Sequence, residues 1–360
     1  MDLLRDSMKQ GHSILLTPNH PRMADPGVMC YLARHTPCNF YAMASWHLFN
    51  QGWFTRLSIR LMGAFSVNRE GLDRHAIDEA IEILQTAERP LLIFPEGTTS
   101  RTNDRLMALM EGPAFIARSA AKRRLKADGG TVVVHPIGIK YVYQGSQSDF
   151  ETTCDAALSK LEKDCLSWTP NHDMPLVERL IKVGNGLLTL KELQYGIAET
   201  ADTHRLRQDD MVNHLLDPLE KEWLGEKQND GIAIRIKNLR MKIFPEMARN
   251  ELEPAERKRR WKQLEETYLA QQIDCYPENY VVAIPSVDRI LETIEKFEED
   301  ITGDCTVHGQ LKAIIDVCEP IEVSTQRVRG VSEDPLMTAI RTSLESKLNE
   351  LQNESKVFPV

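Results

Sequence analysis

Apolar and polar positions alternate in two ways over the first 143 residues of the chain. Short apolar runs of strand length predict strands, which fall at residues 13–18, 63–68, 91–94 and 131–141. Between these runs, apolar residues recur at helical spacing over 75–88 and 104–124, which predicts two helices. Alternating strands and helices favour a largely parallel or mixed sheet flanked by helices, so the predicted fold class is α/β.

The pattern changes near residue 150. From there to about residue 300, long and highly charged segments show helical spacing, and no convincing series of strands occurs. The segment "PAERKRRWKQLEETYLAQQI" at 254–273 is typical. This part of the chain is therefore predicted to be mainly helical.

A strand-like pattern returns near the C-terminus. Residues 312–324 contain a β-branched apolar run that suits a covered sheet, and 334–352 have the spacing of a closing helix. We predict that this strand completes the N-terminal sheet. The predicted organisation is one discontinuous domain, residues 1–143 and 309–360, interrupted by a helical insertion at 144–308.

Composition limits the classes of function. The 360 residues are 42% hydrophobic and 27% charged, and the formal net charge of −9 argues against a nucleic-acid partner, which a basic face would bind. Seven widely spaced cysteines are a poor disulfide framework, so a reducing cytosol is expected. The first twenty residues contain neither a signal-peptide apolar region nor a span of about 20 apolar residues, so we expect no membrane crossing there.

A histidine and an aspartate stand five residues apart in "TPNHPRMADPG", residues 17–27. The segment leaves a predicted strand and enters a predicted helix, with Asp25 expected as the N-cap and Pro26 at the first helical position. Loop geometry there allows the Asp25 carboxylate to approach the His20 imidazole. The same spacing recurs at His204 and Asp209, but on a helix those side chains would point about 140° apart, so we expect that pair not to meet.

An imidazole that is held by a carboxylate can take a proton from an alcohol. The sequence has no G-x-S-x-G nucleophile elbow, which favours direct attack by a substrate hydroxyl over an acyl-enzyme. The alternative is structural, with His20 stabilising its loop and Asp25 capping a helix.

Three further segments lie at predicted strand ends, where ligands collect in open α/β sheets. "FPEGTTSR" at 94–101 combines a glycine turn with Arg101, which is typical of an anion site. "GAFSVNR" ends its strand with Arg69, and "VVVHPIGIKY" supplies the third strand end.

These segments together resemble the glycerolipid acyltransferases, the family that includes 1-acylglycerol-3-phosphate acyltransferase. Its four ordered blocks correspond to "NHPRMAD", "GAFSVNR", "FPEGTTSR" and "VVVHPIG" within residues 19–138. The resemblance implies that His20 is the general base and that Asp25 orients it. It also implies that 1–143 with 309–360 is the acyltransferase domain.

The resemblance further implies residues for the acceptor substrate. Arg69 would hold the acceptor phosphate, and Glu96, Gly97 and Arg101 would complete that site. Thr99 stands where the third block commonly has arginine, which leaves the acceptor headgroup open.

The implied activity is transfer of a fatty acyl group from acyl-coenzyme A or acyl carrier protein to a hydroxyl of a phosphorylated glycerolipid. The favoured acceptor is the lysophospholipid 1-acylglycerol-3-phosphate. Glycerol-3-phosphate is the close alternative, and a non-catalytic lipid-binding or partner-binding protein is the alternative from another class. Neither a metal nor a bound cofactor is expected.

Two segments are candidates for contact with lipid. Residues 45–63 carry four aromatic side chains and two arginines, a pattern that suits an interfacial helix, although core packing is expected for at least half of the aromatics. Residues 101–126 contain seven Lys or Arg against two acidic residues, which is typical either of a solvated helix or of a site for anionic lipid or coenzyme A. We expect a cytoplasmic protein that binds a membrane surface peripherally. His135, on an apolar strand, is expected to be a buried structural histidine.

Overall fold

The computed structural model of the chain describes residues 2–68, 73–127, 129–197, 203–248, 252–277, 279–326, 330 and 333–359. The chain forms two compact units. Unit 1 comprises Met1–Val142 and Ala313–Glu354, and unit 2 comprises Tyr143–Lys312 and Ser355–Val360.

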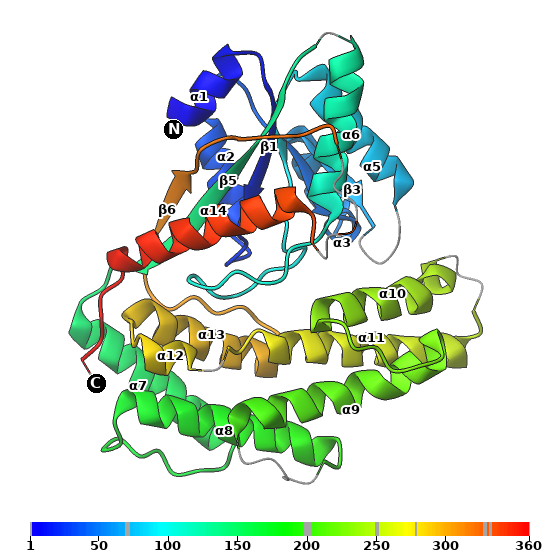
Figure 1. The fold of residues 1–360 in the computed structure, drawn as a ribbon. Helices are drawn as coiled ribbons and strands as arrows, with labels where there is room; N and C mark the ends of the chain where they lie inside the picture. The colour runs from blue at the N-terminus through cyan, green and yellow to red at the C-terminus, as the bar shows by residue number, and fades with distance from the viewer. Residues whose placement is uncertain are drawn as a thin grey trace. The chain divides into compact units, whose positions relative to one another are not determined.

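Unit 1 is built on a mixed sheet (Figure 1). The strand order is β3-β2-β4-β1-β5-β6, and β7 also pairs with β5. The pairs β1–β4, β1–β5, β2–β3 and β2–β4 are parallel, whereas β7 runs antiparallel to β5. The predicted α/β class is confirmed. The bounds are β1 Ser13–Pro18, β2 Tyr41–Ser45, β3 Ala64–Val67, β4 Leu91–Leu92, β5 Val132–Tyr143, β6 Leu311–Val317 and β7 Ile321–Glu322.

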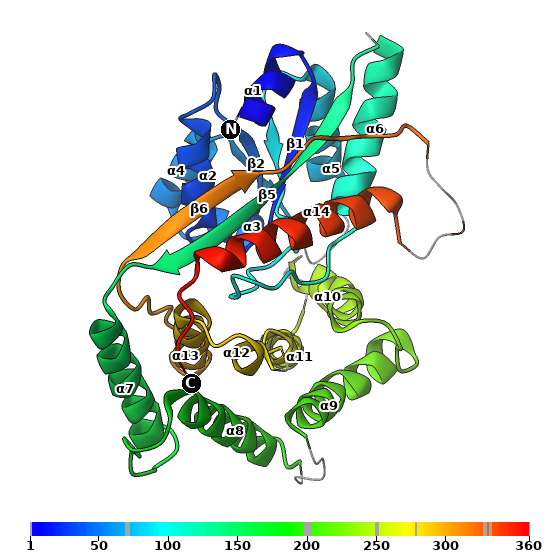
Figure 2. The same ribbon diagram turned by 60° about the vertical axis from the view of Figure 1, so that its left-hand side comes forward.

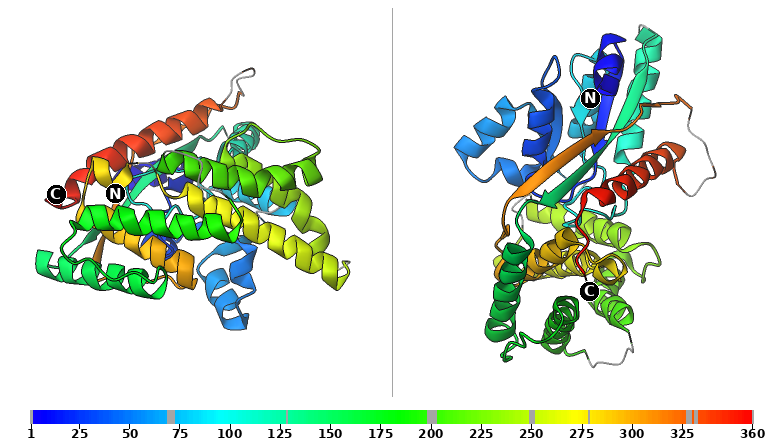
Figure 3. Two further views of the ribbon diagram at one scale, coloured as in Figure 1. Left: turned by 90° about the horizontal axis from the view of Figure 1, so that it is seen from below. Right: turned by 90° about the vertical axis from the view of Figure 1, so that its left-hand side faces the viewer.

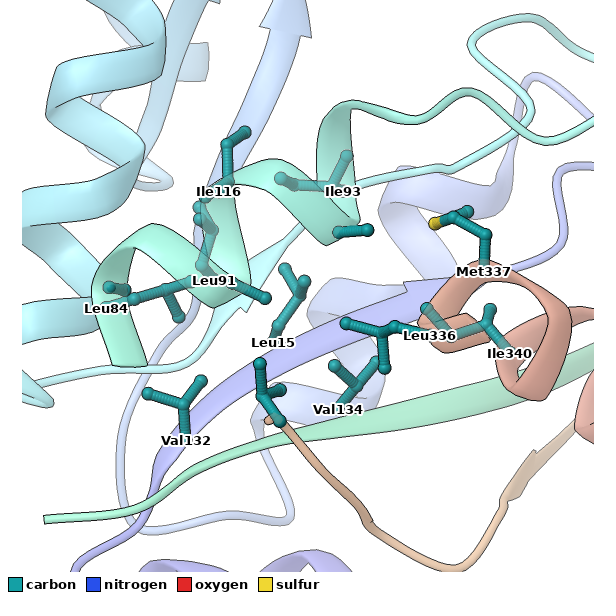
Figure 4. Close-up of a cluster of buried hydrophobic side chains, with 14 of the residues drawn as sticks. Leu15, Leu84, Leu91, Ile93, Ile116, Val132, Val134, Leu336, Met337 and Ile340 are labelled. Atoms are coloured by element: carbon teal, nitrogen blue, oxygen red, sulfur yellow. The ribbon is translucent and has the colours of Figure 1, made fainter. Parts of the chain in front are cut away.

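Strands β1 and β5 form the centre of unit 1. Every residue of both strands is buried, which explains their nearly continuous apolar sequences. On one face of the sheet, side chains of β1, β4 and β5 pack against three helices, α5, α6 and α14, in one apolar cluster (Figure 4). The helices of unit 1 are α1 Asp2–Lys9, α2 Asp25–Ala33, α3 Trp46–Phe49, α4 Trp53–Leu61, α5 Arg74–Thr86, α6 Gly112–Ala127 and α14 Pro335–Leu351, followed by the 3₁₀ turn η1 Gln352–Glu354.

The helix predicted over 104–124 begins later than expected, at Gly112. Residues 101–111 are irregular because their polar groups bond to other parts of unit 1 and not along a helix. The Asn103 side chain accepts the Tyr141 N–H, the Met107 N–H donates to Glu96, and the Met110 N–H donates to a proline carbonyl. Pro113 in the first turn suits a helix start at this point.

The C-terminal segment returns to the sheet as predicted, because β6 and β7 both pair with β5. It forms two strands and not one, separated by a segment that contains Pro320. The expectation of a covered strand was wrong for β6. It lies at the sheet edge beside β5 (Figure 2), and of its residues only Val317 is buried.

The segment 45–63 forms two short helices and not one. The chain breaks at Gly52, whose φ of +133° is a conformation that favours glycine. In α3, Phe49 is buried, whereas none of the residues of α4 is buried.

The described part of unit 2 consists mainly of helices, as predicted for this region. They lie side by side (Figure 3), and each of α7 to α10 contacts the next helix in sequence. The bounds are α7 Gln147–Asp164, α8 Leu176–Gln194, α9 His204–Leu224, α10 Ile232–Ala248, α11 Pro254–Asp274, α12 Tyr280–Ala283 and α13 Val287–Thr302.

Ion pairs between arginine and glutamate join these neighbouring helices. In each, an arginine meets a glutamate of the preceding helix: Arg179 with Glu162 at 2.6 Å, Arg207 with Glu192 at 2.5 Å, Arg235 with Glu220 at 2.6 Å, and Arg260 with Glu246 at 2.5 Å. Both members of the first three pairs are buried. Because a buried charge without a partner is costly, these pairs fix how successive helices are aligned.

The second His-x4-Asp pair does not meet, as predicted. His204 contacts the Asn185 side chain through Nδ1 at 2.6 Å, and Asp209 pairs with Arg205. The side chains of His204 and Asp209 therefore have different partners.

We expect Arg235→Met to lower the free energy of unfolding by about 3–5 kcal/mol, because Glu220 would be left buried without its charged partner. Arg205→Met is the matched control, from helix α9, which also carries Glu220. Its pair with Asp209 is partly exposed and should contribute less than about 1 kcal/mol. Urea denaturation measures both values, and equal losses would contradict the importance of the buried pair.

Candidate active site

The structure brings His20 and Asp25 together. β1 ends at Pro18, a short loop carries His20, and α2 begins at Asp25. His20 Nδ1 lies 2.7 Å from Asp25 Oδ2, with 15% of the His20 side chain exposed and 0% of the Asp25 side chain. Because a carboxylate accepts hydrogen bonds, Nδ1 carries the hydrogen, and Nε2 is the nitrogen that can take up a proton.

The prediction that Asp25 is the N-cap was wrong. Ala24 occupies that position without a side-chain cap, and Asp25 is the first residue of α2. Its carboxylate points instead toward three other donors. Oδ1 accepts the Tyr141 hydroxyl at 2.6 Å, and Oδ2 accepts both the His20 ring and the Arg22 N–H at 2.9 Å. The carboxylate is therefore fixed in direction toward the imidazole.

Residues of the third sequence block hold His20 from the other side. The His20 N–H donates to Glu96 Oε1 at 2.7 Å, and the His20 carbonyl accepts the Ser100 N–H at 2.8 Å. The His20 ring stacks on Phe94, with 4.1 Å between ring centroids. Both main-chain polar groups and one ring face of His20 are thus held by residues 94–100.

Glu96 is a buried carboxyl group that joins two loops. Its second oxygen, Oε2, accepts the Met107 N–H at 2.8 Å, so each oxygen holds one main-chain amide. Burial raises the pKa of Glu96 to about 7, and the nearby negative charge of Asp25 acts in the same direction. The two amides and Arg341 act against this rise.

Two other predicted binding residues lie in the same turn. Gly97 and Arg101 are half-buried and adopt left-handed backbone conformations, with φ of +69° and +56°. Glycine adopts this conformation freely, whereas for arginine it costs on the order of 1 kcal/mol or more. The strained residue is thus one that the sequence assigns to substrate binding. Arg69, the remaining predicted residue, lies outside the described residues.

Strand β5 supplies supports that sequence reasoning missed. The Asn19 side chain bonds to the Ile139 main chain twice, donating at 2.9 Å and accepting at 2.7 Å. Tyr141, two residues further along the strand, donates to Asp25. Burial and the Asp25 charge raise the Tyr141 pKa, so this hydroxyl remains a donor. A tyrosine near the end of a largely apolar strand was the available signal.

The irregular segment 101–111 is anchored by charge. Lys140 of β5 and Asp104 form an ion pair that is almost entirely buried. Arg341 of α14 donates to the Met107 carbonyl at 3.4 Å. The C-terminal helix therefore takes part in holding the segment that Glu96 also binds.

The basic run at 101–126 contributes to packing. Arg118 forms a two-pronged pair with Asp334, at 2.5 and 2.7 Å, and Arg124 donates to the Gly11 carbonyl. Both arginines are buried, so their charges do not belong to a solvated face.

His135 is a buried structural histidine, as predicted. Its Nδ1 donates to the Cys318 carbonyl at 3.0 Å, so Nε2 accepts the Ser7 hydroxyl at 2.9 Å. Burial lowers the His135 pKa and favours this neutral form.

Neither a metal cluster nor a bilayer-spanning helix is found in the described ranges. No three or more His, Cys, Asp or Glu side chains there are grouped to hold a metal ion. Among the same residues, no helix combines the length and apolar character that crossing a bilayer requires.

Comparison with known proteins finds similarity in the N-terminal segment. Residues 4–140 match the family model described as Acyltransferase. This segment is therefore similar to the acyltransferase family. The chain is also 32% identical over 117 residues to a 1-acyl-sn-glycerol-3-phosphate acyltransferase of Streptococcus pneumoniae (strain ATCC BAA-255 / R6). That match covers 32% of this chain and 40% of the relative.

The acyltransferase match confirms the resemblance that the four sequence blocks indicate. The chain spans two fifths of the length of the curated relative that it matches. The helices α7 to α13 lie outside the matched acyltransferase segment.

The buried Glu96 carboxyl should make the free energy of unfolding depend on pH. Between pH 4.5 and about 7 the native carboxyl keeps a proton that the unfolded chain loses, so the free energy of unfolding should fall as the pH rises. The loss should total about 3 kcal/mol. Glu96→Gln cannot ionise and should lack this contribution.

Urea denaturation of the parent protein and of Glu96→Gln across this interval measures the difference. Subtracting one curve of unfolding free energy against pH from the other cancels the contributions of groups that titrate in both proteins. A difference that stays constant from pH 4.5 to above 7 would contradict the raised Glu96 pKa.

Proposed function

We propose that the chain transfers a fatty acyl group from an acyl thioester to a hydroxyl of a phosphorylated glycerolipid. The observation that carries the proposal is the His20 Nδ1–Asp25 Oδ2 contact of 2.7 Å, which orients the ring and directs Nε2 to proton transfer. The acyltransferase-family match and the named activity of the Streptococcus relative support the reaction class. The favoured acceptor is 1-acylglycerol-3-phosphate.

The proposed reaction begins when His20 Nε2 removes the proton of the acceptor hydroxyl. The oxygen attacks the thioester carbonyl and forms a tetrahedral oxyanion. The carbon–sulfur bond then breaks, and the departing thiolate takes the proton from the imidazolium, so His20 returns to its starting form. Asp25 stabilises the transient positive charge on the ring and keeps its orientation while Tyr141 and the Arg22 N–H hold Asp25.

The turn at 96–101 is the proposed acceptor site, together with Arg69. Arg101 would pair with the phosphate, for which a planar guanidinium is well suited. Gly97 lets the main chain turn beside it, and Glu96 fixes this turn against His20. The donor in the proposal is acyl-coenzyme A or acyl carrier protein, and the step needs neither a metal nor a bound cofactor.

We further propose that the protein works at a membrane surface. A lysophospholipid acceptor with a long acyl chain resides in a bilayer, so the enzyme has to reach its hydroxyl there. Peripheral association with the cytoplasmic membrane face is the arrangement that this chemistry favours.

We expect His20→Ala to abolish acyl transfer, because the acceptor hydroxyl would lose its base. Asp25→Asn should retain an intermediate rate, since an amide orients the ring without supplying charge. His204→Ala is the matched control from the second His-x4-Asp pair and should leave the rate unchanged. Transfer of labelled acyl groups from each donor to a panel of acceptors measures these rates.

Equal residual rates in His20→Ala and His204→Ala would overturn the assignment of the base. Transfer to glycerol-3-phosphate in preference to the lysophospholipid would replace the favoured acceptor. Absence of transfer from every donor to every acceptor would support a non-catalytic lipid-binding or partner-binding role.

Replacing Arg101 should raise the acceptor KM and leave the donor KM nearly unchanged, because the acceptor phosphate, and not the donor, would lose a charged partner. Arg101→Gly is the sharper variant, since glycine adopts the observed φ of +56° without strain and removes the whole side chain, including the guanidinium. We expect an acceptor KM at least about 10-fold higher for a lost charge-assisted pair. Arg69→Ala should act in the same direction.

Arg101→Lys should restore the acceptor KM only in part, because an ammonium supplies a point charge in place of a planar fork. Steady-state kinetics with each substrate varied in turn separate the two KM values. An equal rise in both would contradict acceptor binding and indicate a structural role for Arg101.

A further inference from the structure

Helix α4, Trp53–Leu61, exposes large apolar side chains that an ordinary surface helix would bury. Its large apolar residues Trp53, Phe54 and Leu61 are 77%, 68% and 77% exposed. The half-buried positions are occupied instead by Thr55, Ser58 and Ile59. The side of the helix that carries Thr55, Ser58 and Ile59 therefore lies toward the body of unit 1. The side that carries Trp53, Phe54 and Leu61 faces outward.

The exposed apolar residues form one continuous stripe. Trp53, Phe54, Leu57 and Leu61 span about 100° of the helix circumference at about 3.6 residues per turn. An apolar stripe of this width is what a surface helix normally buries against its own core. Met62, directly after the helix, is also exposed and extends the stripe.

The fold holds α4 in this orientation. Gly63 follows the helix with φ of +90°, and a Cβ at this position would lie 2.6 Å from the Phe40 carbonyl oxygen. The Gly63 carbonyl accepts the Ala42 N–H, which ties the end of the helix segment to β2. At the other end, Arg56 Nε donates to the Phe49 carbonyl at 2.9 Å. In Figure 2 the helix lies at the periphery of unit 1, away from β1 and β5.

The charge of the helix favours one kind of binding partner for the apolar stripe. α4 contains Arg56 and Arg60 and no acidic residue, although the whole chain has a formal net charge of −9. Both arginines border the same side of the apolar stripe at helical spacing. Aromatic rings beside arginines suit the boundary between acyl chains and anionic headgroups.

We propose that α4 is the element that docks the protein on an anionic phospholipid surface. Trp53, Phe54, Leu57 and Leu61 enter the acyl-chain boundary, and Arg56 and Arg60 meet headgroup phosphates. This inference rests on the proposed function, in which the acceptor is a membrane lipid. Beyond the proposed function, it names the residues that contact the membrane and states that they select anionic lipid.

Co-sedimentation with vesicles tests the proposal without any acyl donor or acceptor. We expect the parent protein to bind phosphatidylglycerol vesicles more tightly than phosphatidylcholine vesicles. Trp53→Ser with Phe54→Ser should lower the partition coefficient at least about 10-fold, because two large apolar side chains would no longer leave water. Arg60→Glu should lower binding to phosphatidylglycerol and reduce its salt dependence, with little effect on phosphatidylcholine.

Leu125→Ser with Trp261→Ser is the matched control, since it removes two large exposed apolar side chains from other helices. Its partition coefficient should stay within about two-fold of the parent value. Equal losses in the control and in the α4 variant would overturn the proposal, as would equal binding to both lipids. Size-exclusion chromatography without vesicles provides a further outcome: a dimer that only the α4 variant loses would assign the stripe to a second copy of the chain.

The two proposals fail separately. Vesicle binding that depends on α4, without acyl transfer to any acceptor, would remove the proposed function and leave the docking surface. The α4 variant could instead transfer acyl groups to vesicle-embedded acceptors as fast as the parent protein does, and likewise to monomeric acceptors. That result would remove the docking surface and leave the function.

Discussion

The candidate site depends on a buried carboxyl group, Glu96, that holds two main-chain amides at once. One amide belongs to His20 and the other to Met107. Through these bonds a single side chain fixes the loop before α2 against the irregular segment before α6. The arrangement costs free energy because burial opposes ionisation, and the pKa of about 7 expresses that opposition. The His20–Asp25 geometry therefore rests on a group whose burial is itself unfavourable.

His20 is held in place by several residues that are distant from it in sequence. Phe94 stacks on the His20 ring, and the Ser100 N–H donates to the His20 main-chain carbonyl. Tyr141 holds the Asp25 carboxylate that orients the ring. Constraints of this kind reduce the number of positions that the ring can adopt, which is the condition for proton transfer at a defined atom. The strained backbone of Arg101 at the end of the same turn fits a position where the surrounding structure sets the conformation.

The C-terminal part of unit 1 belongs to the structure of the site and not only to the sheet. β6 and β7 pair with β5, the strand that carries Tyr141 and Lys140. Helix α14 adds Arg341, which reaches the Met107 carbonyl. The segment that returns after unit 2 thus supports residues 101–111, although it lies outside the part of the chain that matches the acyltransferase family.

The sequence by itself determined the α/β class, the helical character of unit 2 and the pairing of His20 with Asp25, because these follow from local periodicity and from loop context. It did not determine the irregular course of 101–111 or the outward orientation of α4. Nor did it assign Tyr141, which meets Asp25 across 116 positions of sequence, or the main-chain bond from His20 to Glu96 across 76. These contacts depend on how parallel strands are placed beside one another in the sheet. Local spacing carries no information about that placement, so only the tertiary structure decided them.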